Sequence, residues 1–530
     1  MATKWWTLIA VCTGVFMLLL DITIVNVALP DIQRELHASL SDLQWVIDAY
    51  ALTLAALQLT AGSLADRFGR KRLFAIGTVI FTLGSLLCGL APTTLFLSIS
   101  RAGQGIGGAV MFATALALLS GAFEGRERGT AFAFFGATTG VAVAVGPVLG
   151  GVLTSGLSWN WIFWVNVPIC VLALGVTLTK VEESRNPHAG RLDLAGFVSF
   201  SGGLALLVLA LIRGGENGWS DGSVVWSFVA SGALLVAFVV SQLLQKAPMF
   251  DLGLLRKPTF VGGLVAAVGV SASVFSLLTY LVIYVQNVLG FSAVGAGVRF
   301  LFMSGMSFVA AIVAGRLTSH VPTKWLIAPG FFVVTVGLFL IRGIAVSSDP
   351  GQWTHLIPGL VVSGVGIGLI NVPLASTAVG VVRPERSGMA SGVNSTFRQV
   401  GIATGIATLG SIFSNQVADG IRSSLAGTPV AGRSAQVAAA VTNGQINVLV
   451  SQAPAAVRQT LRSVATRSFV DALNNITLIA AVVALVAGVL CLFLIRARDF
   501  ESQHGGPAAA DRPNRGGKHR ADKRHPVPVG

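Results

Sequence analysis

Fourteen long apolar stretches, separated by short polar segments, limit what this chain can fold into. Each is long enough to cross the hydrocarbon core of a bilayer as a helix, which takes about 20 residues. Backbone polar groups in lipid must be hydrogen-bonded within the chain, so stretches of this length predict helices. The expected spans are 5–28, 44–64, 73–91, 94–120, 129–154, 161–179, 195–212, 224–244, 260–288, 297–317, 325–345, 356–378, 388–413 and 473–495.

The overall composition agrees with a membrane protein. Of the 530 residues, 53% are hydrophobic and only 11% are charged, whereas soluble proteins carry about 25% charged residues. The net charge of +14 does not indicate a nucleic-acid partner, because the charges fall in the gaps between the apolar stretches. The four cysteines stand alone in apolar stretches, so neither a metal site nor a disulfide framework is expected.

The distribution of basic residues predicts an orientation in the plasma membrane. With the N-terminus inside, most of the 36 Lys and Arg residues lie in cytoplasmic segments, and the opposite orientation reverses this bias. Both termini are therefore expected in the cytoplasm. Asp21 and Asn26 interrupt the first stretch and no small-residue cleavage site follows it. We interpret it as a retained helix rather than a signal peptide.

A weak internal repeat predicts how the helices are grouped. The aligned residues are Gly62, Leu64 and Lys71 with Gly315, Leu317 and Lys324. Parallel groups of six helices are an architecture of secondary transporters. We expect an all-α polytopic protein with four parts. These are an N-terminal six-helix bundle (1–180), a linker with two inserted helices (181–258), a C-terminal six-helix bundle (259–498) and a disordered basic cytoplasmic tail (499–530).

One long polar segment interrupts the C-terminal bundle. Residues 415–468 hold five Arg and a single acid, Asp419. We expect an external loop here, either simply solvated or forming a vestibule for a substrate. The run 457–468 is compatible with a short helix.

Two opposite charges are expected at the same depth in the membrane. Asp21 and Arg101 each lie about seven residues from the outer end of their spans, which places both about 10 Å below the outer boundary. A lone charge in a bilayer costs on the order of 2.5–3.5 kcal/mol, so the two are expected to approach each other. Two roles are open for this pair: coupling of Asp21 protonation to conformation, or a static contact that orients two helices.

Other polar residues within the spans are candidates for a substrate cavity. Asn26 and Asp48 lie in the outer half of the predicted bundle, and Asp48 is near enough to a helix end to reach water. Gln104 lies one helical turn after Arg101. Asn394 and Arg398 lie near mid-membrane, where they either line a cavity or bond other helices.

The segment 62–72 is a short basic turn between the second and third spans, and two roles are open for it. Its basic residues either fix the topology alone, or the turn is a latch. In the latch, Asp66 pairs in one conformation with an arginine, such as Arg67, Arg126 or Arg128, and with a neighbouring helix end. The candidate gating residues are Gly62, Asp66, Arg67, Gly69, Arg70 and Lys71.

Glycine spacing in the fifth span predicts close helix packing. Gly136/Gly140 and Gly146/Gly150 are pairs four residues apart, a spacing that lets another helix approach. Pro147 removes a backbone donor and favours a bend. A static seam and a moving hinge both fit this pattern.

Together these motifs resemble those of the fourteen-helix drug/proton antiporters of the major facilitator superfamily. The run from Leu20 to Pro30 resembles the family's first-helix signature, and 62–72 resembles its loop motif. Arg101 with its following glycines and Gln104 is similar to the proton-coupling motif. The residues similar to the antiporter motif are Gly140, Gly146, Pro147, Gly150 and Gly151. Asn160 departs from the family, which usually has Arg between two tryptophans.

The resemblance implies a proton-driven exporter of lipophilic small molecules that works by alternating access. It would be no enzyme, would need no cofactor besides the proton gradient, and would function as a monomer. A narrow exporter of one endogenous metabolite or antibiotic remains an alternative, as does sodium in place of protons. A membrane enzyme or sensor would need a catalytic cluster or signalling domain, and the sequence shows neither.

Overall fold

The computed structural model describes residues 3–38, 40–123, 125–185, 193–245, 248–318, 320–346, 349–426, 431–442 and 446–500. These residues form helices, and no β-strand occurs among them. Each of the fourteen predicted spans matches a helical stretch, although the spans 73–91, 325–345 and 473–495 extend between one and four residues past the helix end. Within the described residues, 12 helices are long and apolar enough to cross a membrane. The prediction of an all-α polytopic membrane protein is confirmed.

The first helices form one set, which we call the N-terminal set. Its helices are α1 (Thr3–Glu35), α2 (Leu40–Phe68), α3 (Arg70–Gly89), α4 (Thr94–Ala122), α5 (Gly125–Gly156), α6 (Trp161–Trp164) and α7 (Asn166–Lys180). The span predicted at 161–179 is divided into α6 and α7. Pro168 has no N–H to offer the carbonyl of Trp164, which explains the break.

The remaining helices follow a hairpin, α8 (Leu194–Asn217) and α9 (Gly222–Leu244). We call the later helices the C-terminal set: α10 (Pro258–Val270), α11 (Ser276–Ile283), α12 (Ala293–Leu317), α13 (Lys324–Ile341), α14 (Leu356–Gly380), α15 (Ser387–Leu425), α16 (Ser434–Thr442), α17 (Ile446–Gln452) and α18 (Ala455–Leu494). Two π-helical turns, Ser271–Phe275 and Tyr284–Val288, precede and follow α11. Short 3₁₀ turns are Leu252–Arg256, Pro350–His355, Pro384–Arg386, Ala431–Arg433 and Ala497–Asp499.

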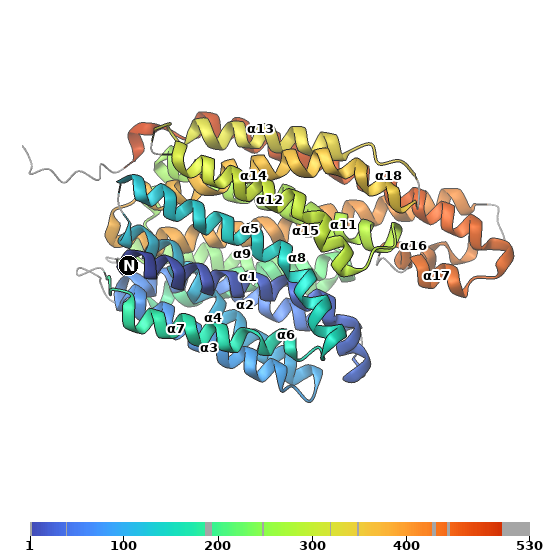
Figure 1. The fold of residues 1–530 in the computed structure, drawn as a ribbon, viewed down its shortest axis with the longest axis horizontal. Coiled ribbons are helices and arrows are strands. Elements are labelled where there is room, and N and C mark those ends of the chain that lie inside the picture. Colours follow the sequence, from blue (N-terminus) through green and yellow to red (C-terminus); the bar gives the residue numbers. More distant parts are fainter. Residues whose placement is uncertain are drawn as a thin grey trace, which may run out of the picture. The chain divides into compact units, whose positions relative to one another are not determined.

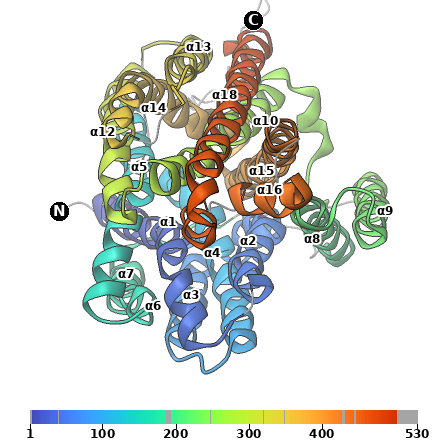
Figure 2. The ribbon, with the colours of Figure 1, turned by 90° about the vertical axis from the view of Figure 1, so that its right-hand side faces the viewer.

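The long helices run side by side (Figure 1). Seen along their axes, α3, α4 and α7 lie on one side and α10, α13 and α18 on the other (Figure 2). One large cluster of buried apolar side chains lies within the C-terminal set, and a second one combines side chains of the N-terminal set with some from α12 and α14. The sets meet mainly where α2 packs against α15 and α5 packs against α12. The α8–α9 hairpin lies at the edge, where α8 contacts α2 and α15.

Glycines allow the two sets to touch at one end of the bundle. Gly62 of α2 faces Gly388 of α15, and Gly129 of α5 faces Gly315 of α12. A Cβ atom added at any of these four positions would overlap backbone or side-chain atoms across the contact. The internal repeat aligns Gly62 with Gly315, so the two contacts are made by related positions. We call this end, which also holds Asp66, the latch end.

The stretch 415–468, expected to be an external loop, is helical over most of its described length. α15 continues to Leu425 and α18 already begins at Ala455, with α16 and α17 between them. Figure 1 places α16 and α17 at the end opposite to the N-terminus of α1. Phe413, Val417 and Ile421 recur every four residues and are fully buried. This helical periodicity lies within a segment whose average composition is polar, which is why composition predicted a loop.

Residue 499, where we expected the tail to begin, contacts the helical bundle. Asp499 accepts hydrogen bonds from the backbone nitrogen (3.1 Å) and the hydroxyl (2.8 Å) of Thr259 at the start of α10. Asp499 therefore belongs to the helical bundle, and residues 501–530 lie outside the described residues.

Asp193 ties the start of α8 to the end of α9. Its carboxylate accepts hydrogen bonds from the backbone nitrogens of Gly196 (2.6 Å) and Met249 (3.2 Å). It also accepts from the side-chain nitrogens of Gln242 (2.7 Å) and Gln245 (2.6 Å). Burial by itself raises the pKa of Asp193, but these hydrogen bonds outweigh it and lower the pKa.

We expect Asp193→Asn to lower the stability of the purified protein by about 1–3 kcal/mol near neutral pH. The new side-chain NH₂ group of asparagine would replace an oxygen that accepts hydrogen bonds, and it would face only other donors. Because the pKa of Asp193 is lower in the folded protein, its carboxylate stabilises the fold at pH values above the unfolded-state pKa of about 3.9. This contribution is lost as the pH falls through the pKa of the folded state. Melting curves of variant and wild type should therefore converge in acid. Asp221→Asn is the control, because Asp221 is an exposed cap of α9 and asparagine caps equally well. An equal loss in both variants would contradict this account.

Candidate functional site

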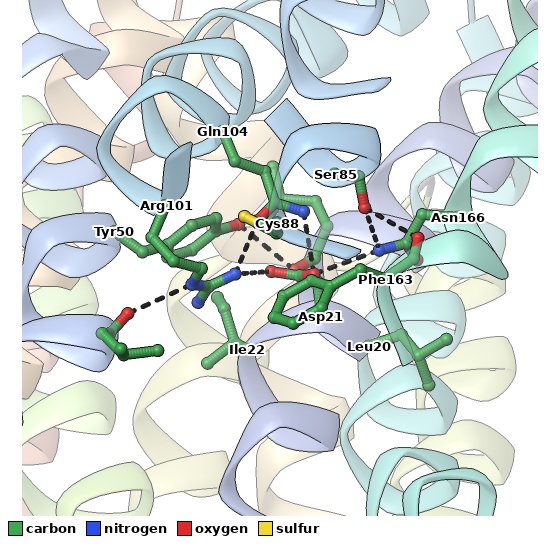
Figure 3. A network of polar contacts seen from close by, with 12 residues as sticks. Leu20, Asp21, Ile22, Tyr50, Ser85, Cys88, Arg101, Gln104, Phe163 and Asn166 are labelled. Carbon is green, nitrogen blue, oxygen red and sulfur yellow. Dashed lines mark hydrogen bonds and ion pairs between the residues drawn. The ribbon is translucent and has the colours of Figure 1, made fainter. Parts of the chain in front are cut away.

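Asp21 of α1 lies at the centre of a buried cluster of polar side chains (Figure 3). Its side chain has 0% exposure, and one carboxylate oxygen pairs with the guanidinium of Arg101 from α4. The other oxygen accepts hydrogen bonds from Gln104 Nε2 (2.9 Å) and from Asn166 Nδ2 of α7 (3.1 Å). The contact between Asp21 and Arg101 that we expected from their depth is present.

Arg101 is held by further groups from α2 and α4. Its Nε donates to the backbone oxygen of Val46 (3.1 Å), and a terminal nitrogen donates to Gln104 Oε1 (2.7 Å). The guanidinium carbon lies 4.2 Å from the ring centroid of Tyr50. The buried charge cluster, as we call Asp21, Arg101, Gln104 and Asn166, therefore connects α1, α2, α4 and α7.

Two members of this arrangement were not predicted. Asn166 also donates to Ser85 Oγ of α3 (2.9 Å), and Ser85 donates to the backbone oxygen of Phe163 (2.8 Å). The available signal in the sequence was Asn166 itself, a side-chain amide near the start of an otherwise apolar stretch. Gln104, predicted as a cavity residue, is fully buried inside the charge cluster.

The energetics make this cluster sensitive to the charge on Asp21. A buried ion pair gains little net stability, but removing one partner costs about 3–5 kcal/mol, because the other charge is left uncompensated. Gln104 and Asn166 satisfy the second carboxylate oxygen. Loss of the negative charge on Asp21 would therefore disturb direct contacts among α1, α4 and α7 and, through Arg101, the contact with α2.

Asp66 forms a second buried cluster at the latch end, between α2 and α15. One carboxylate oxygen accepts from the backbone nitrogen of Gly388 (2.8 Å) and the other from that of Met389 (2.7 Å). These amides belong to the first turn of α15, where a negative charge is favoured by the helix dipole. Asp66 thus joins the N-terminal set to the C-terminal set.

The arginine that pairs with Asp66 is Arg70, and the expected pairing with Arg67 or Arg128 is wrong. Arg70 Nε and a terminal nitrogen donate to Asp66 at 3.0 and 2.8 Å, and the latter nitrogen also donates to Pro384 O at 2.6 Å. Arg67 and Arg128 instead lie over the rings of Phe68 and Phe132. The side chain of the third expected partner, Arg126, lies outside the described residues.

The turn between α2 and α3 depends on Gly69. Its φ of +110° lies in a region that side-chain-bearing residues rarely adopt. After this turn, the backbone nitrogen of Lys71 donates to Glu183 Oε1 (3.0 Å), and Lys71 Nζ donates to Leu178 O (2.9 Å). The turn is thereby fixed to the end of α7.

The glycines of α5 pack against two different helices. A Cβ atom at Gly146 would overlap the Thr23 side chain of α1, and one at Gly150 would lie 3.0 Å from Ile24. A Cβ atom at Gly151 would instead overlap Val294 of α12, whereas Gly140 has room beside it. These glycines therefore form a seam with both sets. The side chain of Pro147 lies outside the described residues.

The remaining candidates do not join the buried charge cluster. Asn26 is exposed and Asp48 is half-buried. Asn394 is buried in α15, and Arg398 of the same helix donates to Asn371 Oδ1 of α14 (3.2 Å). Asn160, where the resemblance led us to expect Arg, donates to Gly89 O (3.0 Å), so a neutral hydrogen bond takes the place of an ionic contact.

Comparisons with known proteins agree with this arrangement. The sequence profile of the Major Facilitator Superfamily matches residues 11–406. The multidrug resistance protein Stp of Mycobacterium tuberculosis (strain ATCC 25618 / H37Rv) is 36% identical over 411 residues, 77% of this chain and 76% of that protein. The tetracenomycin C resistance and export protein of Streptomyces glaucescens is 31% identical over 504 residues, 94% of this chain and 93% of that protein.

A solved structure shows the same fold at low sequence identity. The crystal structure of the human organic anion transporter MFSD10 (TETRAN) superposes with a TM-score of 0.58 and 13% identity, covering 92% of this chain and 99% of that chain. At this identity the likeness concerns the fold alone.

Proposed function

Since this chain belongs to the Major Facilitator Superfamily, we propose that it exports lipophilic drugs or antibiotics in exchange for protons. Similarity over most of both chains to proteins named for multidrug resistance and for tetracenomycin C export supports efflux. The observation that carries proton coupling is the fully buried ion pair of Asp21 and Arg101. Ionisable residues inside a membrane are rare and usually functional.

Protonation of Asp21 would weaken its hold on Arg101 and so change the contacts among α1, α2, α4 and α7. In this proposal a proton binds Asp21 from outside and is released inside after the molecule has changed conformation. Residues 1–180 rock against residues 259–498 as two bundles about the α2–α15 and α5–α12 contacts. We also propose that the protein works as a monomer, since the Asp21–Arg101 pair and the Asp66 contacts are complete within one chain.

We place the latch end and both termini in the cytoplasm. Four basic residues in the segment 67–72, where α2 ends and α3 begins, support this orientation through the positive-inside bias. The latch of Asp66 on the first turn of α15 would then hold the cytoplasmic side closed, and release of the latch would open it.

Reconstituted vesicles test the proposed function. Vesicles that are acidic inside should accumulate tetracenomycin C through the inverted fraction of the protein, and collapse of the pH gradient with nigericin should stop accumulation. A drug panel in the same assay separates a broad exporter from a narrow one. Accumulation that follows a sodium gradient, or no gradient at all, would contradict proton exchange.

A further inference from the structure

Arg398 is a half-buried cation that forms no ion pair among the described residues. It lies about 16 Å along α15 from Ser387, close to the middle of a hydrocarbon core of about 30 Å. Its guanidinium donates to Asn371 Oδ1 at 3.2 Å, and its central carbon lies 5.7 Å from the ring centroid of Phe275. A charge at this depth is expensive unless it has a polar partner or water.

A line of polar side chains leads along α15 to Arg398. Ser387, Ser391, Asn394 and Arg398 follow one another at intervals of three or four residues, so they share one face of the helix. The side-chain oxygens of Ser387, Ser391 and Asn394 are buried and lack a hydrogen-bond partner within the described chain. Buried oxygens of this kind are costly, which points to a ligand or water that they contact during the cycle.

This polar stripe, as we call these four residues, lies next to the contact between the two sets. Gly388 directly follows Ser387, and Gly392 directly follows Ser391. These two glycines pack against Gly62 and Leu59 of α2. At its far end Arg398 reaches Asn371, whose Cβ lies 4.0 Å from the Cβ position of Gly136 in α5. The stripe thus extends from the latch end to mid-membrane along α15. This helix lies between α10 of the C-terminal set and α2 of the N-terminal set (Figure 2).

The helix opposite Arg398 has an irregular turn at the point of contact. Phe275 ends the π-helical turn Ser271–Phe275, which packs against α15. Single π-helical turns occur frequently at functional sites, where they redirect a side chain. An aromatic ring beside the guanidinium also suits a lipophilic ligand with a charged group.

From this arrangement we propose that Arg398 binds an anionic oxygen, such as a carboxylate or phenolate, on a lipophilic substrate. This inference rests on the proposed function as an exporter. Arginine stays charged at every physiological pH and presents a planar fork that matches an oxyanion with two hydrogen bonds. Asp21 is fully buried and paired with Arg101, so it is not offered to a cationic substrate. A substrate cation would also be repelled by Arg398.

Three pyrene compounds that differ only in their end group test this proposal: 1-pyrenebutyrate, 1-pyrenebutanol and 1-pyrenebutylamine. Binding to the full chain in nanodiscs is followed by quenching of tryptophan fluorescence. Wild type should bind the butyrate about tenfold more tightly than the alcohol, and the amine most weakly. Arg398→Gln should remove the preference for the butyrate and leave the affinity for the alcohol within about twofold.

Two further variants separate recognition from folding. Arg398→Lys keeps the charge without the fork, so it should retain part of the preference. Arg299→Gln is the matched control: Arg299 of α12 also lies over aromatic rings, at 3.4 and 4.7 Å from the centroids of Phe291 and Trp353, but outside the polar stripe. It should bind all three compounds as wild type does. Equal weakening of all three compounds by Arg398→Gln, a wild-type preference for the amine, or no binding of any compound would overturn the proposal.

Transport of the same compounds distinguishes a failure of this inference from a failure of the proposed function. Vesicles that show the butyrate preference in binding but no gradient-driven movement would refute the exporter and leave the oxyanion site in place. Gradient-driven movement of all three at equal rates, with equal affinities, would refute the oxyanion site alone.

Discussion

Asp21→Asn is expected to reduce export driven by a pH gradient by about 100-fold or more, because the group that binds the proton is gone. Asparagine keeps the shape of the side chain and an acceptor for Arg101. Loss of the counter-ion of Arg101 should cost up to about 3–5 kcal/mol of stability, so export is compared per molecule that reaches the membrane. Vesicles with an imposed pH gradient measure the rate, and the amount of protein in the membrane serves as the normalisation. Full gradient-driven export by Asp21→Asn would remove Asp21 from the mechanism.

A pair of variants decides whether the Asp21–Arg101 ion pair couples protons to export or only orients the helices. Arg101→Met alone leaves the Asp21 carboxylate buried without its counter-ion and should cost about 3–5 kcal/mol of stability. The double variant Asp21→Asn/Arg101→Met removes both charges and should recover most of this loss. A static contact predicts that the double variant exports as wild type does, whereas a proton-coupling pair predicts that it is stable and inactive.

Asp66→Asn is expected to open the latch end. The substitution removes the charge that accepts from the amides of Gly388 and Met389 and from Arg70. A hydrogen bond to a charged group contributes about 1.5–3 kcal/mol, so the closed arrangement should lose about 10- to 100-fold in relative population. A single cysteine at Ser391, buried beside this contact, should then react at least about tenfold faster with a water-soluble maleimide.

The chain offers a matched control for this variant. Asp251 also pairs with an arginine, Arg386, at 2.6 Å, but the two side chains are 42% and 51% exposed. Exposed pairs contribute about 0–1 kcal/mol, so Asp251→Asn should leave both the labelling rate and transport near wild type. Similar effects of the two variants, or unchanged labelling in Asp66→Asn, would speak against a latch.

The membrane spans and the main ion pair could be predicted because they follow from simple distances. Apolar stretches of about 20 residues set the helices, and the rise per residue placed Asp21 and Arg101 at one depth. The internal repeat also aligned two of the glycines that now lie at equivalent contacts between the two sets. These features depend on length and order along the chain, which a sequence contains in full.

The partners of individual side chains were harder to predict. Arg67 directly follows Asp66 in the chain, and neighbours one apart on a helix do not face each other, whereas residues four apart do. That rule favours Arg70, yet the turn at Gly69 lies between the two residues and makes the register uncertain without a structure. Asn166 and Ser85 were missed because an isolated amide or hydroxyl in an apolar span does not show which side chain of another helix it will bond.

The most direct test of proton coupling follows protons rather than substrate. Vesicles carry a pH-sensitive dye inside, start with equal pH on both sides, and receive a concentration gradient of tetracenomycin C. Wild type should move protons in the direction opposite to the substrate, and the stable double variant Asp21→Asn/Arg101→Met should move none. Proton movement by the double variant at the wild-type rate would contradict the central claim that the Asp21–Arg101 pair couples protons to export.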